Sequence, residues 1–432
     1  MVLKRVVLLL VSVSLSSALA WAGNGHLLHG VGAINSSMGG AGVALLEDSI
    51  AALHINPALL IKAQGNQISF SSEFFKDGLS VVAKVGNATT GTDATTQLGV
   101  IPAFGWMAHK PGAPMALGFG LLGEAGFRTD YPQDSSDFLL LPQPQAFGRI
   151  FTDLSIVKIP IAFAFQVNPK LAVGFSFNIY RGSLAIQPLP VVQPDCAPDG
   201  NCWLPGAGNQ VSRFGLGLQL GAYYELNPMV SLGFSYTTKQ YFQHYQWNST
   251  VENPELASFG TARILKFNLD GPQTVQFGVG LHPTKKLSLA ADGKFIKYRG
   301  VAGIGGDAGV DTINHKLIGI GWRNIWVGML GADYKLNDKI SLRAGYNHGQ
   351  TPIRSDFTVT SMGTPSTFQK HFCLGAGLAV MPHVSADLGF YIVPKETVSG
   401  PILSLYRGVI PSSQIDMSNS ITSGLISLNF SF

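Results

Sequence analysis

The chain ends in Ser423-Gly-Leu-Ile-Ser-Leu-Asn-Phe-Ser-Phe432, and this stretch indicates the fold. In an extended strand one face would be apolar and the other polar: Ile426, Leu428, Phe430 and Phe432 against Ser427, Asn429 and Ser431. A strand needs this alternation when one side contacts lipid and the other a wet lumen. A terminal Phe also resembles the signal that the barrel-assembly machinery reads. The alternative is an ordinary amphipathic strand that ends in Phe by chance.

The first 22 residues have the layout of a secretory signal peptide. Lys4 and Arg5 precede an apolar run, which leads to an A-x-A cleavage site ending at Ala22. We expect cleavage after Ala22, with cleavage after Ala20 as the alternative. The layout predicts an exported protein, in which residues 1–22 carry no mature function.

Composition narrows the class of protein. Only 12% of the 432 residues are charged, and 51 are glycine. Beyond the signal, no apolar run reaches the roughly 18 residues that a membrane helix needs. A barrel closes its backbone hydrogen bonds between strands, so a membrane protein without apolar helices is possible. The net charge of +4 is too small and too dispersed to argue for nucleic acid binding.

The three cysteines allow at most one bridge within the chain. Cys196 and Cys202 flank a short segment and can form a disulfide in an oxidising compartment. A zinc site would need two more soft ligands nearby, and none is evident, so we expect no metal. Cys373 lies in a strand-like stretch and is interpreted as a small packing residue.

The rest of the chain repeats one plan of six hairpins with tight turns. The expected turns are at Pro111, Pro169, Asn227-Pro228, His282-Pro283, Asn337-Asp338 and Met381-Pro382. Each interval holds two strands of about ten residues, enough to cross a bilayer at a tilt. A strand at residues 66–85 and the C-terminal strand raise the total to fourteen. The pattern predicts an all-β, fourteen-stranded antiparallel transmembrane barrel over residues 66–432, with short periplasmic turns and long outer loops.

Charged residues fall mostly on the inner parity of these strands. Asp292, Lys294, Arg343 and Asp387 are examples. We interpret them chiefly as structural ion pairs in the lumen.

Residues 23–65 do not have the pattern of a β-strand, and they are rich in small side chains. Asp48 can cap a short helix, which should end near Ile55 because Pro57 biases Asn56 away from helical geometry. We therefore expect residues 23–65 to form a hatch, or plug, inside the barrel.

Several motifs resemble the FadL-type long-chain fatty acid transporters, which include the TodX-type aromatic-hydrocarbon transporters. Asn56-Pro57-Ala58, preceded by Gly39-Gly-Ala-Gly42, resembles the NPA motif of the family's hatch. Ile101-Pro-Ala-Phe-Gly-Trp106 and Gly321-Trp-Arg-Asn-Ile-Trp326 are similar to family strands. The resemblance covers nearly the whole mature chain.

The resemblance implies a monomer in the outer membrane of a Gram-negative bacterium, which binds hydrophobic compounds and releases them sideways through a kinked third strand. That strand would carry Gly118, Gly120 and Gly123, whose lack of side chains suits either a broken ladder or tight packing. Long-chain fatty acids are the first expected substrate class, and monoaromatic hydrocarbons are the alternative.

Two outer loops are unusually apolar, and exposed apolar patches often mark binding sites. Phe138, Leu140 and Phe147 in the first of them are candidate substrate contacts, although the loops could instead pack on each other. A fatty acid also needs a cation for its carboxylate. By local similarity the candidates are Arg181 and Lys316, although Arg181 has lipid-facing parity.

Rival classes are disfavoured. No nucleophile motif such as G-x-S-x-G is present, so no catalytic residue and no cofactor are expected. A general diffusion porin would lack the plug and would not need apolar loops. The sequence thus predicts a transporter rather than an enzyme.

Overall fold

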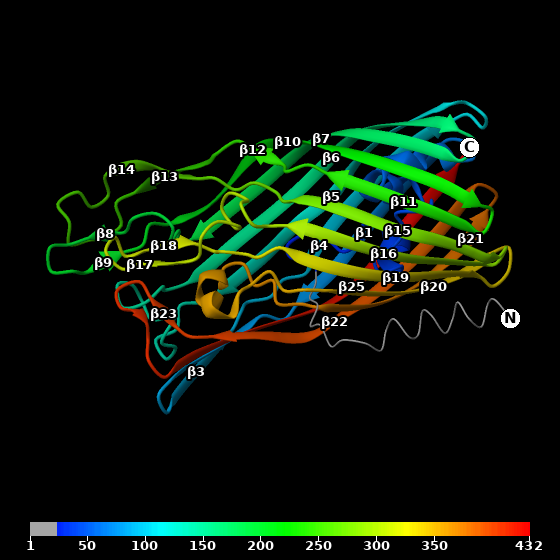
Figure 1. Cartoon of the computed structure of the whole chain (residues 1–432). Helices are drawn as coiled ribbons and strands as arrows, with labels where there is room; N and C mark the ends of the chain where they lie inside the picture. The colour runs from blue at the N-terminus through cyan, green and yellow to red at the C-terminus, as the bar shows by residue number, and fades with distance from the viewer. Residues whose placement is uncertain (1–23) are drawn as a thin grey trace.

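The computed structural model describes residues 24–432, so the predicted signal peptide lies outside the described residues. Fourteen antiparallel strands form a closed barrel (Figure 1). They are β1 Gln67–Asp77, β4 Gly99–His109, β5 Met115–Tyr131, β6 Ile150–Asn168, β7 Leu171–Gln187, β10 Ala207–Asn227, β11 Val230–Thr237, β15 Gln273–Thr284, β16 Leu287–Lys297, β19 Ile325–Lys335, β20 Ile340–Gly349, β21 Lys370–Met381, β22 Val384–Gly400 and β25 Ser413–Ser431. The predicted fold class is confirmed.

The C-terminal strand closes the barrel by pairing with the first strand. Gln67 lies opposite Ser431, and the register continues to Asp77 opposite Ile421. The predicted parity of this strand is confirmed, because Ile426 and Leu428 are exposed on the outside while Ser427 is buried inside. The two ends of the barrel sequence, Asn66 and Phe432, thus meet at the periplasmic end of the barrel.

The first strand is interrupted, where the sequence predicted one run over residues 66–85. It continues after Gly78 and Leu79 as β2 Ser80–Val85, which still pairs with β25. On its other edge β2 pairs with β3 Ala88–Asp93 and no longer with β4. This hairpin projects from the outer end of the barrel (Figure 1).

Of the six predicted turns, five lie between consecutive strands and one, the fourth, does not. The prediction at His282-Pro283 is wrong, because the turn lies at Lys285 and Lys286 and β15 runs on to Thr284. The pairing of β15 with β16 shifts between Leu281 and Thr284. Pro283 is tolerated in the strand because it falls at this irregularity, where no ladder donor is needed.

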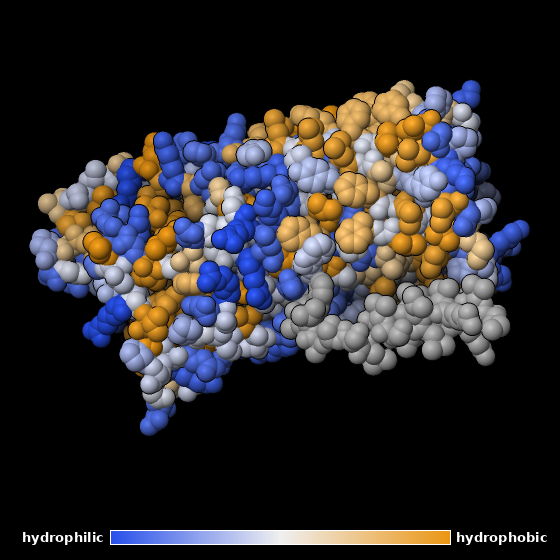
Figure 2. Space-filling view, in the orientation of Figure 1, coloured by the Kyte–Doolittle hydropathy of each residue, from blue (hydrophilic) through white to orange (hydrophobic). Residues whose placement is uncertain are grey.

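The outer loops carry the small elements of the fold. They include β8 Asp195–Cys196, β9 Cys202–Trp203, β12 Tyr241–Phe242, β13 Tyr245–Thr250, β14 Ala262–Phe267, β17 Gly309–Asp311, β18 Lys316–Gly319, η2 Ser355–Ser361, β23 Leu403–Ser404 and β24 Gly408–Val409. Across residues 24–432, we find no helix with the length and apolar character to span a membrane. Figure 2 shows apolar side chains gathered over the barrel wall and a more polar surface over the loops.

Residues 24–65 fill the barrel interior and are called the hatch segment below. The segment contains α2 Ala33–Ser37, α3 Ser49–Ile55 and η1 Pro57–Lys62. Asp48 caps α3 by accepting a hydrogen bond from Ala51 N at 2.7 Å, and the helix ends at Ile55 as predicted. The helices contact opposite walls: α2 packs on β20, β21 and β22, and η1 on β6, β7 and β10.

Candidate functional site

Asn56 joins the hatch segment to the barrel wall. Its Nδ2 donates to the carbonyl of Val43 at 2.8 Å and to that of Ala222 in β10 at 3.0 Å. Its Oδ1 accepts from Ala58 N at 3.0 Å and so caps η1. Gly221 lies against this amide, because a Cβ there would collide with Asn56 Oδ1. The Asn-Pro-Ala motif is therefore a buried anchor as well as a helix cap.

Asp292 of β16 provides a second anchor. Its Oδ2 accepts from the backbone N–H groups of Gly42 and Val43, both at 2.9 Å, and from Gln276 Nε2 at 2.9 Å. The inward charge predicted at this position thus binds the hatch. Arg343 forms the ion pairs expected of the lumen, at 2.6 Å to Asp333 and 2.7 Å to Asp387.

The ladder between β4 and β5 is incomplete. The two strands pair only from His109 opposite Ala116 to Phe104 opposite Leu121. Further out, β5 forms a bulge at Glu124 in its pairing with β6. Backbone groups of β5 that lack β4 as a partner bind residues 26–28 instead: Leu28 N donates to Glu124 O, and Gly126 N to His26 O, each at 3.0 Å. The start of the hatch segment thus acts as a short added strand in the gap between β4 and β5.

The three glycines predicted on this strand have different surroundings. Gly118 and Gly120 lie within the intact ladder, and a Cβ at either position would press on Leu53 of α3. Gly123 lies at the bulge, where a Cβ would meet Ile101 and approach Leu28. Close packing accounts for the first two glycines, and the irregular backbone accounts for the third.

Tyr298, just beyond the outer end of β16, holds the start of the hatch segment. Its hydroxyl donates to Asn24 O at 3.2 Å and accepts from His26 N at 3.1 Å. Burial lowers the pKa of the His26 imidazole to about 4, with the charge of Glu124 opposing this shift. His26 is therefore neutral at physiological pH, and its ring packs beside Tyr298 and Trp322.

Above the hatch segment, buried aromatic and aliphatic side chains pack against one another in the lumen, and this packed apolar cluster is called the chamber below. Its fully buried rings come from β7, the outer loops and the ends of β16 and β19: Tyr180, Tyr245, Trp247, Tyr298 and Trp322. The hydroxyls of Tyr180 and Tyr245 find no hydrogen-bond partner among residues 24–432. Burial raises the pKa of Tyr245, so its hydroxyl stays protonated. The chamber therefore combines apolar walls with two unused donors.

A charged cluster lies beneath the chamber. Lys158 of β6 is buried and donates to Gln219 Oε1 at 2.9 Å and His54 O at 3.3 Å. His54 Nδ1 lies 3.6 Å from Glu124 Oε2, which links α3 to the bulge in β5. Lys294 of β16 is also buried, and Glu124 acts electrostatically on both ammonium groups.

Lys158 adjoins the chamber directly. It lies opposite Tyr180 in the β6–β7 ladder, two residues from the chamber residue Ile156. Lys294 is likewise two residues from Ile296, a chamber residue on the same face of β16. A polar floor with two ammonium groups is an arrangement that can receive the anionic end of an otherwise apolar molecule.

The apolar residues of the first of these outer loops pack mostly against neighbouring elements of the fold. Leu140 is fully buried and Phe147 half-buried in a cluster with residues of β2, η2 and β23. Phe138 remains partly exposed, at 36%. Of the three, Phe138 alone presents a large apolar surface to the medium.

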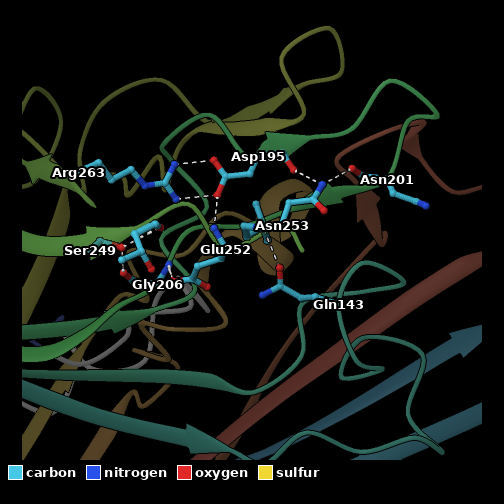
Figure 3. A network of polar contacts seen from close by, with 10 residues as sticks. Gln143, Asp195, Asn201, Gly206, Ser249, Glu252, Asn253 and Arg263 are labelled. Atoms are coloured by element: carbon cyan, nitrogen blue, oxygen red, sulfur yellow. Dashed lines mark hydrogen bonds and ion pairs between the residues drawn. The ribbon is translucent and has the colours of Figure 1, made fainter. Parts of the chain in front are cut away.

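A polar network clamps two outer loops together (Figure 3). Arg263 of β14 binds both carboxylate oxygens of Asp195, at 2.5 and 2.8 Å. Asn253 Nδ2 donates to the carbonyls of Asp195 and Asn201, at 2.9 and 3.0 Å. Cys196 and Cys202 are joined by a disulfide within the same loop. Cys373, in contrast, is a buried free thiol on β21.

The two cations proposed from sequence similarity do not meet in the lumen. Arg181 lies on the outer face of β7, where its guanidinium donates to Ser212 Oγ at 2.9 Å. The strand does not bend before this position, so Arg181 keeps the outward parity of Val173, Phe175 and Phe177. Lys316 lies half-buried in β18, in an outer loop. Neither side chain lines the chamber.

Sequence reasoning gave no role to Lys158 or Glu124. Lys158 could have been found, because it shares inward parity with Ile156 in a strand that is otherwise apolar at its centre. Glu124 could not, because the bulge that turns its backbone toward the hatch has no local sequence signal beyond the neighbouring glycines.

Comparisons with known proteins agree with this geometry. Residues 13–402 match the family model Toluene_X, described as outer membrane protein transport protein (OMPP1/FadL/TodX). The chain is 22% identical over 390 residues to outer membrane protein P1 of Haemophilus influenzae, covering 81% of each chain.

Solved structures share the fold. A Pseudomonas aeruginosa FadL homologue superposes with a TM-score of 0.71 at 16% identity, covering 94% of this chain and 100% of the other. The Pseudomonas putida toluene transporter TodX gives a TM-score of 0.67 at 20% identity, covering 94% and 99%.

A closed barrel with a plugged lumen and an apolar chamber defines a class of outer-membrane transport protein. The chain belongs to the OMPP1/FadL/TodX family. It is an outer membrane protein of Gram-negative bacteria that transports hydrophobic compounds and is not an enzyme.

Proposed function

We propose that this transporter carries long-chain fatty acids. The observation that supports this most directly is the pair of buried lysines beneath the apolar chamber. A neutral hydrocarbon would have no use for Lys158 and Lys294, whereas a fatty acid must find a cation or hydrogen-bond donors for its carboxylate. In the proposed complex the side chains of the chamber move apart to admit the acyl chain. The carboxylate binds the ammonium group of Lys158 or Lys294 and the hydroxyl of Tyr180.

The proposed route begins at the outer loops and ends in the membrane. Phe138 offers the first apolar contact, because it is partly exposed while its neighbours are packed. From the chamber the acyl chain leaves between β4 and β5, where residues 26–28 cover the break in the ladder. Displacement of that short segment would open a lateral path without breaking any pair in the barrel itself. Residues 23–65 thus serve as the hatch of the proposed transporter.

Monoaromatic hydrocarbons are the second candidate. Two related structures are described as a toluene transporter and, for CymD, a monoaromatic hydrocarbon channel. Within this chain, the aromatic walls of the chamber suit such a substrate, and Lys158 already has protein acceptors. A general porin is less favoured because the hatch segment fills the lumen.

The test is uptake of radiolabelled oleate and toluene by cells that lack their own transporter and express this chain. The wild type is compared with Lys158→Met paired with Glu124→Gln, so that the Lys158 ammonium is removed together with the carboxylate that acts on it, while Lys294 keeps the charge of Asp292 nearby. Arg181→Met is the matched control, because it removes a cation of similar length from the outer face. We expect saturable oleate uptake that falls at least about tenfold in the double variant and not in the control.

Other results would redirect the assignment. Uptake of toluene alone, unaffected by the double variant, would assign the chain to the hydrocarbon branch. Absence of both uptakes, with the barrel at the surface and free dye entry into proteoliposomes, would favour a porin.

A further inference from the structure

A basic hollow lies on the outside of the barrel, apart from the lumen. It has a volume of about 510 Å³, and its lining includes Arg299, Arg323, Arg354, Asp307, Asn324 and Trp322. All three arginines are exposed. The single carboxylate of Asp307 leaves an excess of positive charge.

Backbone contacts fix the arginines relative to one another. Arg299 N donates to Asn324 Oδ1 at 2.8 Å, which ties the end of β16 to the segment before β19. Arg323 N donates to Pro352 O at 2.9 Å, and its Nε donates to Thr351 O at 3.1 Å. Three separate chain segments thus converge, and all three arginines line the same hollow.

The guanidinium groups have few protein anions to bind. Arg354 lies 3.8 Å from Asp356, which is itself 73% exposed, and it stacks on Phe357 at 4.6 Å. For Arg299 and Arg323, no carboxylate of residues 24–432 lies within ion-pair distance. Arginine is the side chain best suited to bind phosphate oxygens in pairs, so these two are available for an external anion.

The hollow lies just beyond the outer ends of β16 and β19. Phe295 and Lys297 share the outward parity of β16, and the exposed Arg299 follows in the turn just beyond the strand, so basic residues come directly after the apolar wall. Trp326, 41% exposed on the outside of β19, packs 4.8 Å from Phe295. Exposed aromatic rings of this kind mark the interface between hydrocarbon and headgroups. Figure 2 shows hydrophilic side chains between the apolar barrel wall and the loops.

The hollow is closed toward the lumen. Trp322 contributes to its lining, but the residue is only 1% exposed and its ring belongs to the wall of the chamber. Its indole N–H donates to Ser361 Oγ at 3.2 Å. The hollow is therefore a surface site rather than an entrance for substrate.

We propose that this hollow binds a phosphate group of the outer-leaflet glycolipid, the phosphorylated and acylated glucosamine disaccharide that anchors lipopolysaccharide. The arginines bind the phosphate, and the acyl chains lie along the apolar face below Phe295 and Trp326. This inference goes beyond the proposed function, because it concerns the outer surface and not the transport path.

The test is native mass spectrometry of the detergent-solubilised protein with added lipid. The wild type is compared with Arg299→Gln/Arg323→Gln/Arg354→Gln, and Lys285→Gln/Lys335→Gln/Lys339→Gln is the control at the periplasmic turns. We expect the diphosphorylated lipid to bind the wild type and control alike, and the arginine variant at least about tenfold more weakly. Enzymatically dephosphorylated lipid should bind all three weakly.

Equal binding by the arginine variant, or equal binding of the dephosphorylated lipid, would overturn the proposal. Inorganic phosphate that binds as tightly as the whole lipid would reject a lipid site, and displacement of the lipid by oleate would assign the hollow to substrate. Heat-modifiable migration in gels reports whether each barrel is folded. If the triple variant misfolds, the binding of the same lipids by the single variant Arg323→Gln is compared with that of the wild type instead.

Discussion

Asn56 in the hatch segment and Ala222 in β10 are joined by a hydrogen bond of 3.0 Å from the side-chain amide to the backbone carbonyl. The same amide group also binds Val43, so one side chain fixes two parts of the hatch to one strand of the wall. If the hatch moves relative to the barrel, either this hydrogen bond breaks or β10 moves with the hatch.

Asn56→Ala should therefore lower uptake severalfold while leaving the barrel folded. The substitution leaves the carbonyls of Val43 and Ala222 without this hydrogen-bond donor, each at a cost of about 1–3 kcal/mol, and it removes the cap of η1. Oleate and toluene uptake, normalised to surface expression, is the measurement. Gln64→Ala is the control, because Gln64 is exposed and binds only Lys62 O at 3.4 Å. Unchanged uptake by Asn56→Ala with normal expression would refute the anchoring role.

Arg263→Ala should loosen the outer loops. It leaves the Asp195 carboxylate without its bidentate partner, so the loop closed by Cys196 and Cys202 loses its bond to β14. Protease cleavage of intact cells should become several times faster between residues 188 and 206. Lys266→Ala removes an exposed cation from the same strand and should have no effect. Equal cleavage rates in both variants would show that the clamp does not restrain the loops.

Acidification should release the start of the hatch segment. The pKa of His26 is about 4 when buried, against 6.5 as its ordinary value, so the docked segment binds fewer protons than the released one. The docked state therefore loses stability as pH falls from about 6.5 toward 4, by about 2 kcal/mol between pH 7 and pH 5.

Hydrogen-exchange protection factors of residues 26–28, which correct for the intrinsic effect of pH on exchange, measure this release. His26→Phe keeps the ring but cannot be protonated, so its protection should be independent of pH in this range. A decline of equal size in that variant would assign the effect to another group.

A photoreactive fatty acid should label the gap between β4 and β5. If the acyl chain leaves laterally, crosslinks found by mass spectrometry should centre on Ile101, Gly123 and Leu28, which surround the break. Oleate in excess should suppress them. Labelling confined to the periplasmic turns would instead support a path along the barrel axis.

Strand parity made most of the barrel predictable. The alternation of Ile426, Leu428 and Phe430 with buried Ser427 and half-buried Asn429 is a local pattern. It is kept in the structure because alternate side chains of a strand face lipid and lumen. The turn at Lys285 and Lys286 was missed since Pro283 usually ends a strand, yet here it falls at an irregular pairing. Local sequence preference does not show where the pairing between two strands is irregular.

The site was less predictable because it depends on contacts between distant segments. His54, Glu124 and Lys158 come together from α3, β5 and β6, and no spacing in the sequence reports their proximity. Local similarity directed attention to Arg181, whose outward parity already argued against a lumenal role. The apolar character of the loop around Leu140 is visible in the sequence, but its packing on β2, η2 and β23 depends on the assembled outer surface.

The pairing of β25 with β1 has a consequence for biogenesis. Asn66 and Phe432 exchange backbone hydrogen bonds at 2.9 and 3.0 Å, so the seam of the cylinder joins the two ends of the barrel sequence. Among the pairs of neighbouring barrel strands, β1 and β25 have the largest separation in sequence, so their pairing closes the longest loop. The hatch segment immediately precedes β1, and the closed barrel surrounds it. The folded barrel thus encloses the segment of the same chain that leads into its first strand.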